Sequence, residues 1–212
     1  MKKSKSTTSA EEPIQLPPLK RKIIKIPIIG DSPLICHRFS DRSKRKMLDR
    51  QMKKATSGRE VRNPEQEYEE SLYVLPDGSY GFPASGFKSA SVSACRQTDG
   101  MPMTKAKGAF HVLGEYVKIK GKPRMREDMV RLESGVADLR YRAEFPQWST
   151  EVTVAFNESV ISAEQLINLF ELAGFAVGVG DWRPGAPKSA TGSYGTFHVA
   201  RGNEGEQKKA RR

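Results

Sequence analysis

The sequence predicts an α+β domain with a βαββαβ core. Three segments carry this prediction: a β-branched run at residues 21–29, an alternating apolar segment at 150–157, and a strongly capped helix at 162–173. The 212 residues are 37% hydrophobic and 29% charged, which is ordinary for a soluble domain and sufficient for one core. We therefore expect a single domain over residues 21–200.

Both ends of the chain are predicted to be disordered tails. Residues 1–20 are polar and then punctuated by proline, and residues 201–212 form a basic segment whose only apolar residue is Ala210. No stretch of the sequence approaches the roughly 18 apolar residues that a membrane span needs, and the first residues lack the apolar centre of a signal peptide. From these observations we expect a cytoplasmic location and no membrane partner.

The first strand is predicted from a run of β-branched residues, which are Ile23, Ile24, Ile26, Ile28 and Ile29. Pro27 lies inside this run. Proline cannot donate a hydrogen bond to a neighbouring strand, so the strand is expected near a sheet edge or at a bulge.

The cysteine and histidine content argues against a metal site. Cys36 and Cys95, together with three histidines, provide neither a disulfide framework nor the spacing of zinc ligands. Both cysteines are expected to be reduced core residues. We expect no metal and no other cofactor.

The positive charge is concentrated in the first third of the chain. The formal net charge is +11, and residues 1–66 hold 17 Lys/Arg against 7 Asp/Glu, whereas residues 67–212 hold 19 against 18. A basic excess in one region favours a polyanionic partner. Nucleic acid is therefore the expected partner.

Residues 40–66 are predicted to form an excursion from the core, with a basic helix capped by Ser40 and then a polar, mobile loop. The helix has only a thin apolar stripe, and eight basic residues against two acidic ones lie between Arg38 and Lys54. The alternative to a polyanion contact is a solvated surface helix. The candidate contacts are Arg38, Arg42, Lys44, Arg45 and Lys46.

A hairpin is predicted at residues 72–82 and a helix at 83–97. Pro76, Asp77 and Gly78 supply the turn of the hairpin, and Pro83 suits the first turn of the helix. The small residues of this helix would let it lie close to a sheet or to a bound backbone.

The start of this helix is a candidate phosphate site. Free backbone N–H groups and the positive end of the helix dipole favour an anion there. Ser85 and Lys88 can reach the same phosphate, and Arg96 adds a positive charge further along. The alternative is a capped helix without a ligand.

From residue 109 the chain is predicted to form strands and one more helix. The strands are expected at 109–119, 128–134, 137–145 and 149–156, and a last one at 175–180 with a continuation at 194–199. In the helix at 162–173, Ser162 and Gln165 form a capping box and Gly174 ends the helix.

The core would then use the strands at 21–29, 137–145, 150–157 and 175–180/194–199, with the helices at 83–97 and 162–173. This order is the ferredoxin-like or RRM-like arrangement. The basic helix, the β-hairpin at 72–82 and the region 105–134 would be insertions.

The glycine-rich stretch at residues 174–199 is another candidate site. Glycine lets a second backbone approach closely, so Gly178 and Gly180 are expected to meet a nucleic-acid backbone. Trp182 and Tyr194 can stack on bases, and Arg183 can bind a phosphate. The alternative is a structural hairpin loop in which Trp182 folds over the sheet and Arg183 pairs with a carboxylate.

Three segments resemble the RAMP superfamily, the repeat-associated RNA-binding proteins that include the backbone subunits of CRISPR effector complexes. They are the first strand running into "IIGDSPLIC", the helix opening "GFPASGFKSASVSACR", and the glycine-rich "GVGDWRPGAPKSATGSYGTFHV". The resemblance spans residues 21–199 and implies an RRM-like fold, RNA binding and a thumb-like insertion at 40–66. The "GDWRP" element also resembles phage-encoded proteins, which implies a bacterial cell or a phage-infected host and allows single-stranded DNA as well as RNA.

The favoured function is that of a non-enzymatic protein that coats single-stranded RNA or DNA as a head-to-tail homo-oligomer, through backbone contacts. Catalysis has little support because the three histidines, His37, His111 and His198, lie in strand-like or apolar surroundings. One alternative is a metal-dependent RNA nuclease, which would rest on Asp31. The other is a structural or assembly protein with an acidic protein partner.

Overall fold

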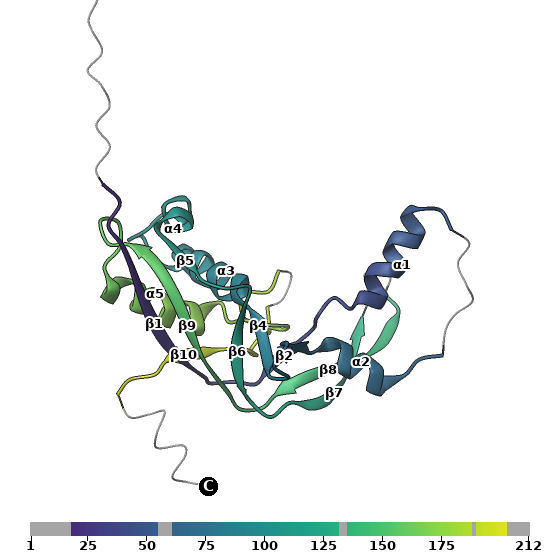
Figure 1. Cartoon of the computed structure of the whole chain (residues 1–212). Helices are drawn as coiled ribbons and strands as arrows, with labels where there is room; N and C mark the ends of the chain where they lie inside the picture. The colour runs from purple at the N-terminus through teal and green to yellow at the C-terminus, as the bar shows by residue number, and fades with distance from the viewer. Residues whose placement is uncertain (1–17, 55–60, 132–134, 188–189, 203–212) are drawn as a thin grey trace, which may run out of the picture.

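A computed structural model describes residues 18–54, 61–131, 135–187 and 190–202, and contains two antiparallel sheets (Figure 1). The predicted tails fall almost entirely outside these residues. The larger sheet has the order β10-β1-β9-β6-β4-β3, and β5 also pairs with β9. Its strands are β1 Arg21–Gly30, β3 Tyr73–Val74, β4 Tyr80–Pro83, β5 Phe110–Val112, β6 Tyr116–Gly121, β9 Trp148–Asn157 and β10 Phe197–Val199.

The smaller sheet has the order β2-β8-β7 and lies in the other half of the molecule (Figure 1). Its strands are β2 Leu34–Cys36, β7 Arg124–Arg131 and β8 Ala137–Phe145. The helices are α1 Asp41–Gln51, α2 Pro64–Ser71, α3 Ala84–Ala94 with a 3₁₀ turn at Cys95–Gln97, α4 Met103–Ala109 and α5 Ala163–Ala176.

Strand β1 pairs with β9 along nearly its whole length, but only Ile28, Ile29 and Gly30 pair with β10. The outer edge of its earlier part has no neighbouring strand among the described residues. Pro27 lies where the pairing with β10 stops, and its carbonyl accepts a hydrogen bond from Ala200 N at 2.9 Å. The position of proline at an edge agrees with the prediction.

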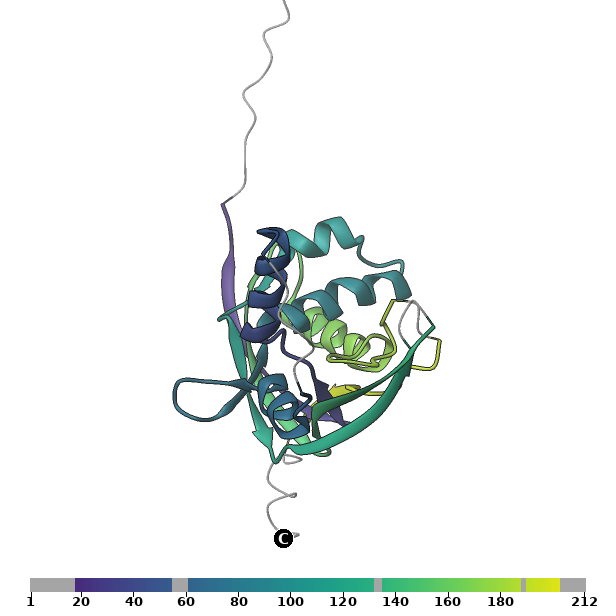
Figure 2. The same ribbon diagram turned by 90° about the vertical axis from the view of Figure 1, so that its right-hand side faces the viewer.

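Helices α3 and α5 cover one face of the larger sheet, and no helix of the described residues lies on the opposite face (Figure 2). The alternation of β1 follows from this arrangement: Ile26 and Ile28 are buried, whereas Ile23 and Lys25 point to the uncovered face and are exposed. The core therefore lies between the sheet and these two helices.

The α+β class and the ferredoxin-like order are confirmed, but two of the predicted core segments are wrong, and the first is residues 137–145. Residues 137–145 form β8 of the smaller sheet, and β5 and β6 provide the core strand that pairs with β9. Alternation predicts that a segment is a strand, but it does not specify the neighbouring strand, because pairing is set by contacts distant in sequence.

The predicted strand at 175–180 is also wrong. Helix α5 has the predicted capping box between Ser162 and Gln165 but continues to Ala176, and the chain then enters a loop. Gly174 does not end the helix. A Cβ at this position would lie 1.8 Å from the carbonyl oxygen of Phe197, so the glycine lets α5 approach β10.

The predicted basic helix is confirmed as α1, where Ser43 N donates to the Ser40 hydroxyl at 3.2 Å. The polar loop expected after it contains a second helix, α2, capped by Asn63; residues 55–60 lie outside the described ranges. Helix α2 lies along β8, where Ala143 N donates to the Ser71 hydroxyl at 2.8 Å. The hairpin at 72–82 is confirmed as β3 and β4.

None of the helices in the described ranges is both long enough and apolar enough to cross a membrane.

Candidate nucleic-acid interface

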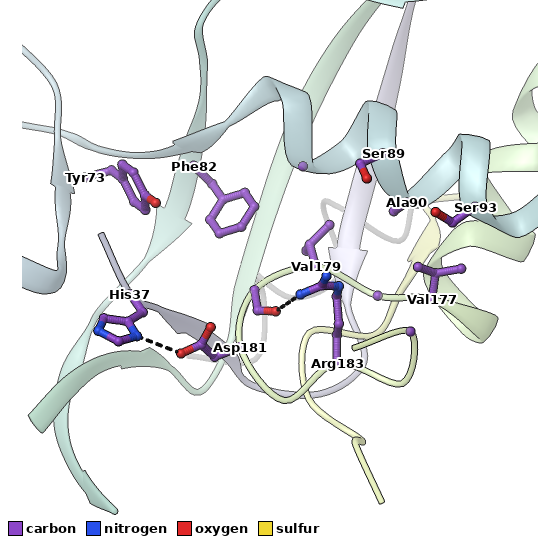
Figure 3. Close-up of a pocket in the computed structure, with 14 residues that line it drawn as sticks. His37, Tyr73, Phe82, Ser89, Ala90, Ser93, Val177, Val179, Asp181 and Arg183 are labelled. Atoms are coloured by element: carbon purple, nitrogen blue, oxygen red, sulfur yellow. Dashed lines mark hydrogen bonds and ion pairs between the residues drawn. The ribbon is translucent and has the colours of Figure 1, made fainter. Parts of the chain in front are cut away.

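Helix α3 and the loop that follows α5 line a pocket of about 250 Å³ (Figure 3). The helix contributes its small residues Gly86, Ser89, Ala90 and Ser93. They recur at intervals of three and four residues, which puts them on one face. The loop, residues 177–185, forms the facing wall.

At one end of this pocket the dominant group is the Arg183 guanidinium. Its Nη1 donates to the carbonyl of Gly180 at 2.9 Å, and in the described part of the chain no carboxylate pairs with it. Figure 3 shows Arg183 on the loop side of the pocket and Ser89 and Ser93 on the helix side. We call these three residues the arginine end; their donors suit a phosphate group.

The other end contains a carboxylate and three rings, contributed by Asp181, His37, Tyr73 and Phe82 (Figure 3). His37 Nδ1 lies 3.1 Å from Asp181 Oδ2. We call these four residues the carboxylate end. A negative group beside ring faces does not suit a phosphate, so the two ends of the pocket differ in chemistry.

The glycines of the loop fit the protein's own backbone. Gly180 has φ +81°, and a Cβ there would lie 2.6 Å from the carbonyl oxygen of Ile35. The next residue, Asp181, donates its N–H to that same carbonyl at 3.0 Å. Gly178 has φ +68°, and its Cβ would lie 3.0 Å from the Gly195 carbonyl. Protein backbone therefore occupies the space that a Cβ would take at both positions, so the fold itself requires glycine there. Both glycines also line the pocket, and their contact with a nucleic-acid backbone stays a prediction.

Trp182 faces the smaller sheet and not the pocket. Its backbone has φ +56°, an unfavourable conformation for a non-glycine residue. The ring lies 4.5 Å from the Arg142 guanidinium and 5.4 Å from that of Arg126, and it contacts Tyr194. Trp182 therefore follows the structural alternative, and its cation–π contacts hold the loop against β7 and β8.

An ion-pair network connects the smaller sheet to the loop. Arg142 is 2% exposed and donates to Asp181 at 2.8 Å and to Asp128 at 2.7 Å. Arg126 donates to Asp128 and Glu144, and its Nη2 donates to the Tyr194 hydroxyl at 3.1 Å. Tyr194 is thereby positioned by an arginine, as part of the support of the loop.

The Asp181 carboxyl belongs both to this network and to the lining of the pocket. Desolvation by burial raises its pKa, but hydrogen bonds from His37 and Arg142 outweigh that effect, so the pKa lies below the usual value. Asp181 is therefore ionised at neutral pH, and the carboxylate end carries a negative charge.

Of the residues predicted at the start of α3, only Ser85 lies on the side of the pocket. It is exposed, one helical turn before Ser89. Lys88 Nζ instead donates to the carbonyls of Lys107 at 3.0 Å and of Phe110, and lies 3.8 Å from the Phe110 ring centre. Burial lowers the pKa of Lys88 to about 8. Lys88 thus caps the end of α4 and does not join Ser85 in holding one phosphate.

Arg96 is exposed in the 3₁₀ turn after α3, and its Nε donates to Met103 Sδ at 3.2 Å. It lies eleven residues beyond Ser85, about 16 Å along a helix axis. The two residues therefore cannot bind the same phosphate.

The basic residues in and next to α1 lie on a projection separate from the pocket. None of the residues of this helix is buried, and it stands out from the smaller sheet (Figure 1). Two of the basic side chains near its start contact its first acidic residue: Arg38 and Lys44 both donate to Asp41, at 2.9 and 3.0 Å. The other predicted contacts lie on the same helix, and they are Arg42, Arg45 and Lys46.

Asp31 is paired with His198, whose Nδ1 lies 2.5 Å from its Oδ1. Within the described ranges there is no group of three or more His, Cys, Asp or Glu side chains that could hold a metal ion. Cys36 and Cys95 are buried thiols, as predicted, and burial raises the pKa of Cys36 to about 12.

Sequence reasoning placed Arg183 in the site but missed Ser89, Ser93, His37 and Tyr73. A signal for the serines was present, because they are spaced by four residues on a helix with Gly86 and Ala90. His37 and Tyr73 reach the pocket from segments far away in sequence, and no local pattern indicates this.

The fold has relatives among solved structures, although no protein-family model matches the sequence and a search of curated proteins finds no match. A chain in the cryo-EM structure of the type III-B Cmr-beta bound to cognate target RNA superposes with a TM-score of 0.53 at 11% identity, covering 86% of this chain. This chain spans 60% of the length of that one.

A second solved structure, the crystal structure of Cmr6 from Pyrococcus furiosus, gives a TM-score of 0.44 at 13% identity and covers 86% of this chain and all of that one (100%). The assignment of the fold rests on the Cmr-beta chain and on the sheet order described above. The chain shares its fold with the Cmr-beta chain, which agrees with the fold that the three sequence motifs imply.

Proposed function

We propose that the protein binds single-stranded nucleic acid between α3 and the glycine-rich loop. The observation that carries the proposal is the Arg183 guanidinium, which lies in a pocket opposite two serine hydroxyls without a carboxylate partner among the described residues. A phosphate is the group that such a donor set binds best. The small residues of α3 leave room for a sugar-phosphate backbone beside it.

The basic helix α1 supplies a second, less specific contribution. Its lysines and arginines would attract any polyanion, and their effect would depend on salt concentration because counterions are released on binding. RNA is the preferred ligand in this proposal, since the Cmr-beta structure with a similar fold was determined with bound target RNA.

We further propose that the protein acts without catalysis and coats the strand as a head-to-tail oligomer. An unburied helix such as α1 is suited to reach a neighbouring copy on the same strand. The setting would be the cytoplasm of a bacterial cell.

The direct test is binding of fluorescently labelled single-stranded RNA and DNA of mixed sequence to the Arg183→Ala protein. Loss of one charge-assisted contact is worth about 1.5–3 kcal/mol, so affinity should fall about tenfold or more. Lys120→Ala is the matched control, because Lys120 is an exposed lysine on β6 in the larger sheet and its loss changes the net charge equally. Equal effects of the two substitutions would contradict the proposed site.

The melting temperature of both variants must be recorded, since Arg183 also donates to the Gly180 carbonyl. If Arg183→Ala is folded and binds like the parent protein, phosphate does not bind at the arginine end. If purified protein carries no nucleic acid and binds neither RNA nor DNA, an assembly protein with an acidic protein partner becomes the better description.

A further inference from the structure

The pocket between α3 and the loop has two chemically different ends, and a nucleic-acid backbone accounts for only one of them. Arg183, Ser89 and Ser93 suit a phosphate, whereas Asp181 would repel it. A volume of about 250 Å³ is close to the lower end of small-molecule pockets, about 300–1,000 Å³. The carboxylate end therefore requires a different part of the ligand.

The Asp181 carboxylate still has an acceptor available. Its Oδ2 accepts hydrogen bonds from the Arg142 guanidinium at 2.8 Å and from His37 Nδ1 at 3.1 Å. Its Oδ1 accepts no hydrogen bond within the described ranges of the chain. In Figure 3 this oxygen points away from His37, toward the space below Phe82. An ionised carboxylate is an acceptor only, so its ligand must donate.

Three ring side chains line this end of the pocket together with the acceptor. Tyr73 and Phe82 line the carboxylate end together with the His37 imidazole, whose side chain is 41% exposed. Rings beside a partly exposed acceptor are typical of sites that take an unstacked base of a single strand and read its Watson–Crick edge.

Resting on the proposed function, we propose that the carboxylate end binds one base of the strand and prefers guanine. The Watson–Crick edge of guanine presents two adjacent donors, N1–H and the 2-amino group. Adenine and cytosine place a ring-nitrogen acceptor next to their single amino group, and uracil places N3–H between two carbonyls. Only guanine directs two adjacent donors at an ionised oxygen from that edge, while its phosphate lies at the arginine end.

Mononucleotides test the proposal on the unchanged protein, because each carries one phosphate and one base. Dissociation constants are measured by calorimetry for guanosine, inosine, adenosine, cytidine and uridine 5′-monophosphates. Guanosine monophosphate should bind at least tenfold more tightly than the adenosine, cytidine and uridine forms, about 1.4 kcal/mol. Inosine monophosphate, which keeps N1–H but lacks the 2-amino group, should lie between them. Equal affinities, or a preference for another base, would overturn the proposal.

If the mononucleotides bind too weakly to measure, the same comparison uses RNA strands of about twelve nucleotides, within the usual site sizes of single-strand binders. One strand contains only A, C and U, and the other has one A replaced by G. At least tenfold tighter binding of the second strand is expected, and equal binding refutes the guanine preference.

Two substitutions separate this inference from the proposed function. Asp181→Asn, checked for folding by its melting curve, should remove the preference for guanine. Arg183→Ala should weaken binding of every nucleotide and strand. Binding that depends on Arg183 without any preference for guanine would leave the proposed function standing and reject the base pocket. Insensitivity to Arg183→Ala would reject the proposed function itself.

Discussion

At the scale of single residues, the glycine-rich loop shows how a flexible sequence can fold into a closely fitted structure. Three residues of the loop hydrogen-bond to the segment after β1. Asp181 N donates to the Ile35 carbonyl, Gly195 N donates to that of Pro33, and the Thr196 carbonyl accepts from Asp31 N. The glycines are needed for these close approaches, because a side chain at these positions would collide with the facing backbone.

Gly180→Ala is expected to destabilise the protein. The added Cβ would lie 2.6 Å from the Ile35 carbonyl, at a φ of +81° that itself costs a non-glycine residue about 1–2 kcal/mol. The total loss should be about 2 kcal/mol or more, measured by urea unfolding. Gly78→Ala is the control, because Gly78 has φ +75° but nothing within 4 Å of its Cβ position, and should show only the smaller conformational cost. A Gly180→Ala protein as stable as the control would contradict the close fit.

Asp181 should make stability depend on acid pH. Its folded-state pKa is lowered, whereas in the unfolded chain it titrates near 3.9, so its contribution is present above about pH 4 and is lost as pH falls through the folded pKa. Asp181→Asn should therefore be less stable than the parent at pH 7, and the difference should shrink below about pH 4. Thermal unfolding across this range measures it, and a difference independent of pH would show that the charge of Asp181 does not stabilise the fold.

The position of a side chain could be predicted from the sequence only where it does not depend on partners that are distant in the chain. Arg183 was predicted to bind a phosphate and lies in the pocket, where that role stays a prediction. Trp182 has the shape of a stacking residue, but its partners are Arg126 and Arg142, which lie far earlier in the chain. A single sequence does not indicate which arginines will meet a tryptophan, because this depends on the pairing of β7 with β8.

At the scale of elements, α1 offers the clearest separation of binding from folding. Replacing Arg42, Lys44, Arg45 and Lys46 together with alanine removes four positive charges from a helix that has no buried residue. Affinity for all single strands should fall, and the slope of binding against salt should decrease by about one for each lost phosphate contact. The melting temperature should change little.

Titration of labelled RNA at several salt concentrations measures both quantities. The Lys120→Ala protein again serves as a reference for a change of charge outside α1. Unchanged affinity and salt slope would identify α1 as a solvated surface helix.

Helices were predicted more successfully than sheet membership, for a physical reason. The caps of α1 and α5 are local, so Ser40 and Ser162 indicate the helix starts in the sequence itself. The apolar and polar residues of β8 alternate as in any strand, but this pattern does not specify that the strand pairs with β7 and β2. The small α2 was missed because its sequence is acidic and polar, without a clear apolar stripe.

At the scale of the whole molecule, the separate positions of α1 and the pocket suit a chain of copies along one strand. If the protein coats nucleic acid, the mass measured by light scattering should grow in steps of one protomer as the RNA is lengthened. Without RNA, or with the four alanine substitutions in α1, the steps should be lost or require higher protein concentration. A complex of constant mass on RNAs of increasing length would rule out coating.

The pairing of β1 has a consequence for the synthesis of the protein. Its partners β9 and β10 come near the end of the chain, with Ile28 opposite Val199, so at about 5–20 residues per second the isoleucine-rich strand waits about ten to thirty seconds for its last neighbour. An unpaired β-branched run is prone to aggregate during such a delay, and Lys25 and Pro27 interrupt it. Pro27→Val should therefore lower the soluble fraction recovered from translation, while the stability of the purified protein changes less. The reason is that the proline hinders aggregation of the nascent chain before the native sheet forms.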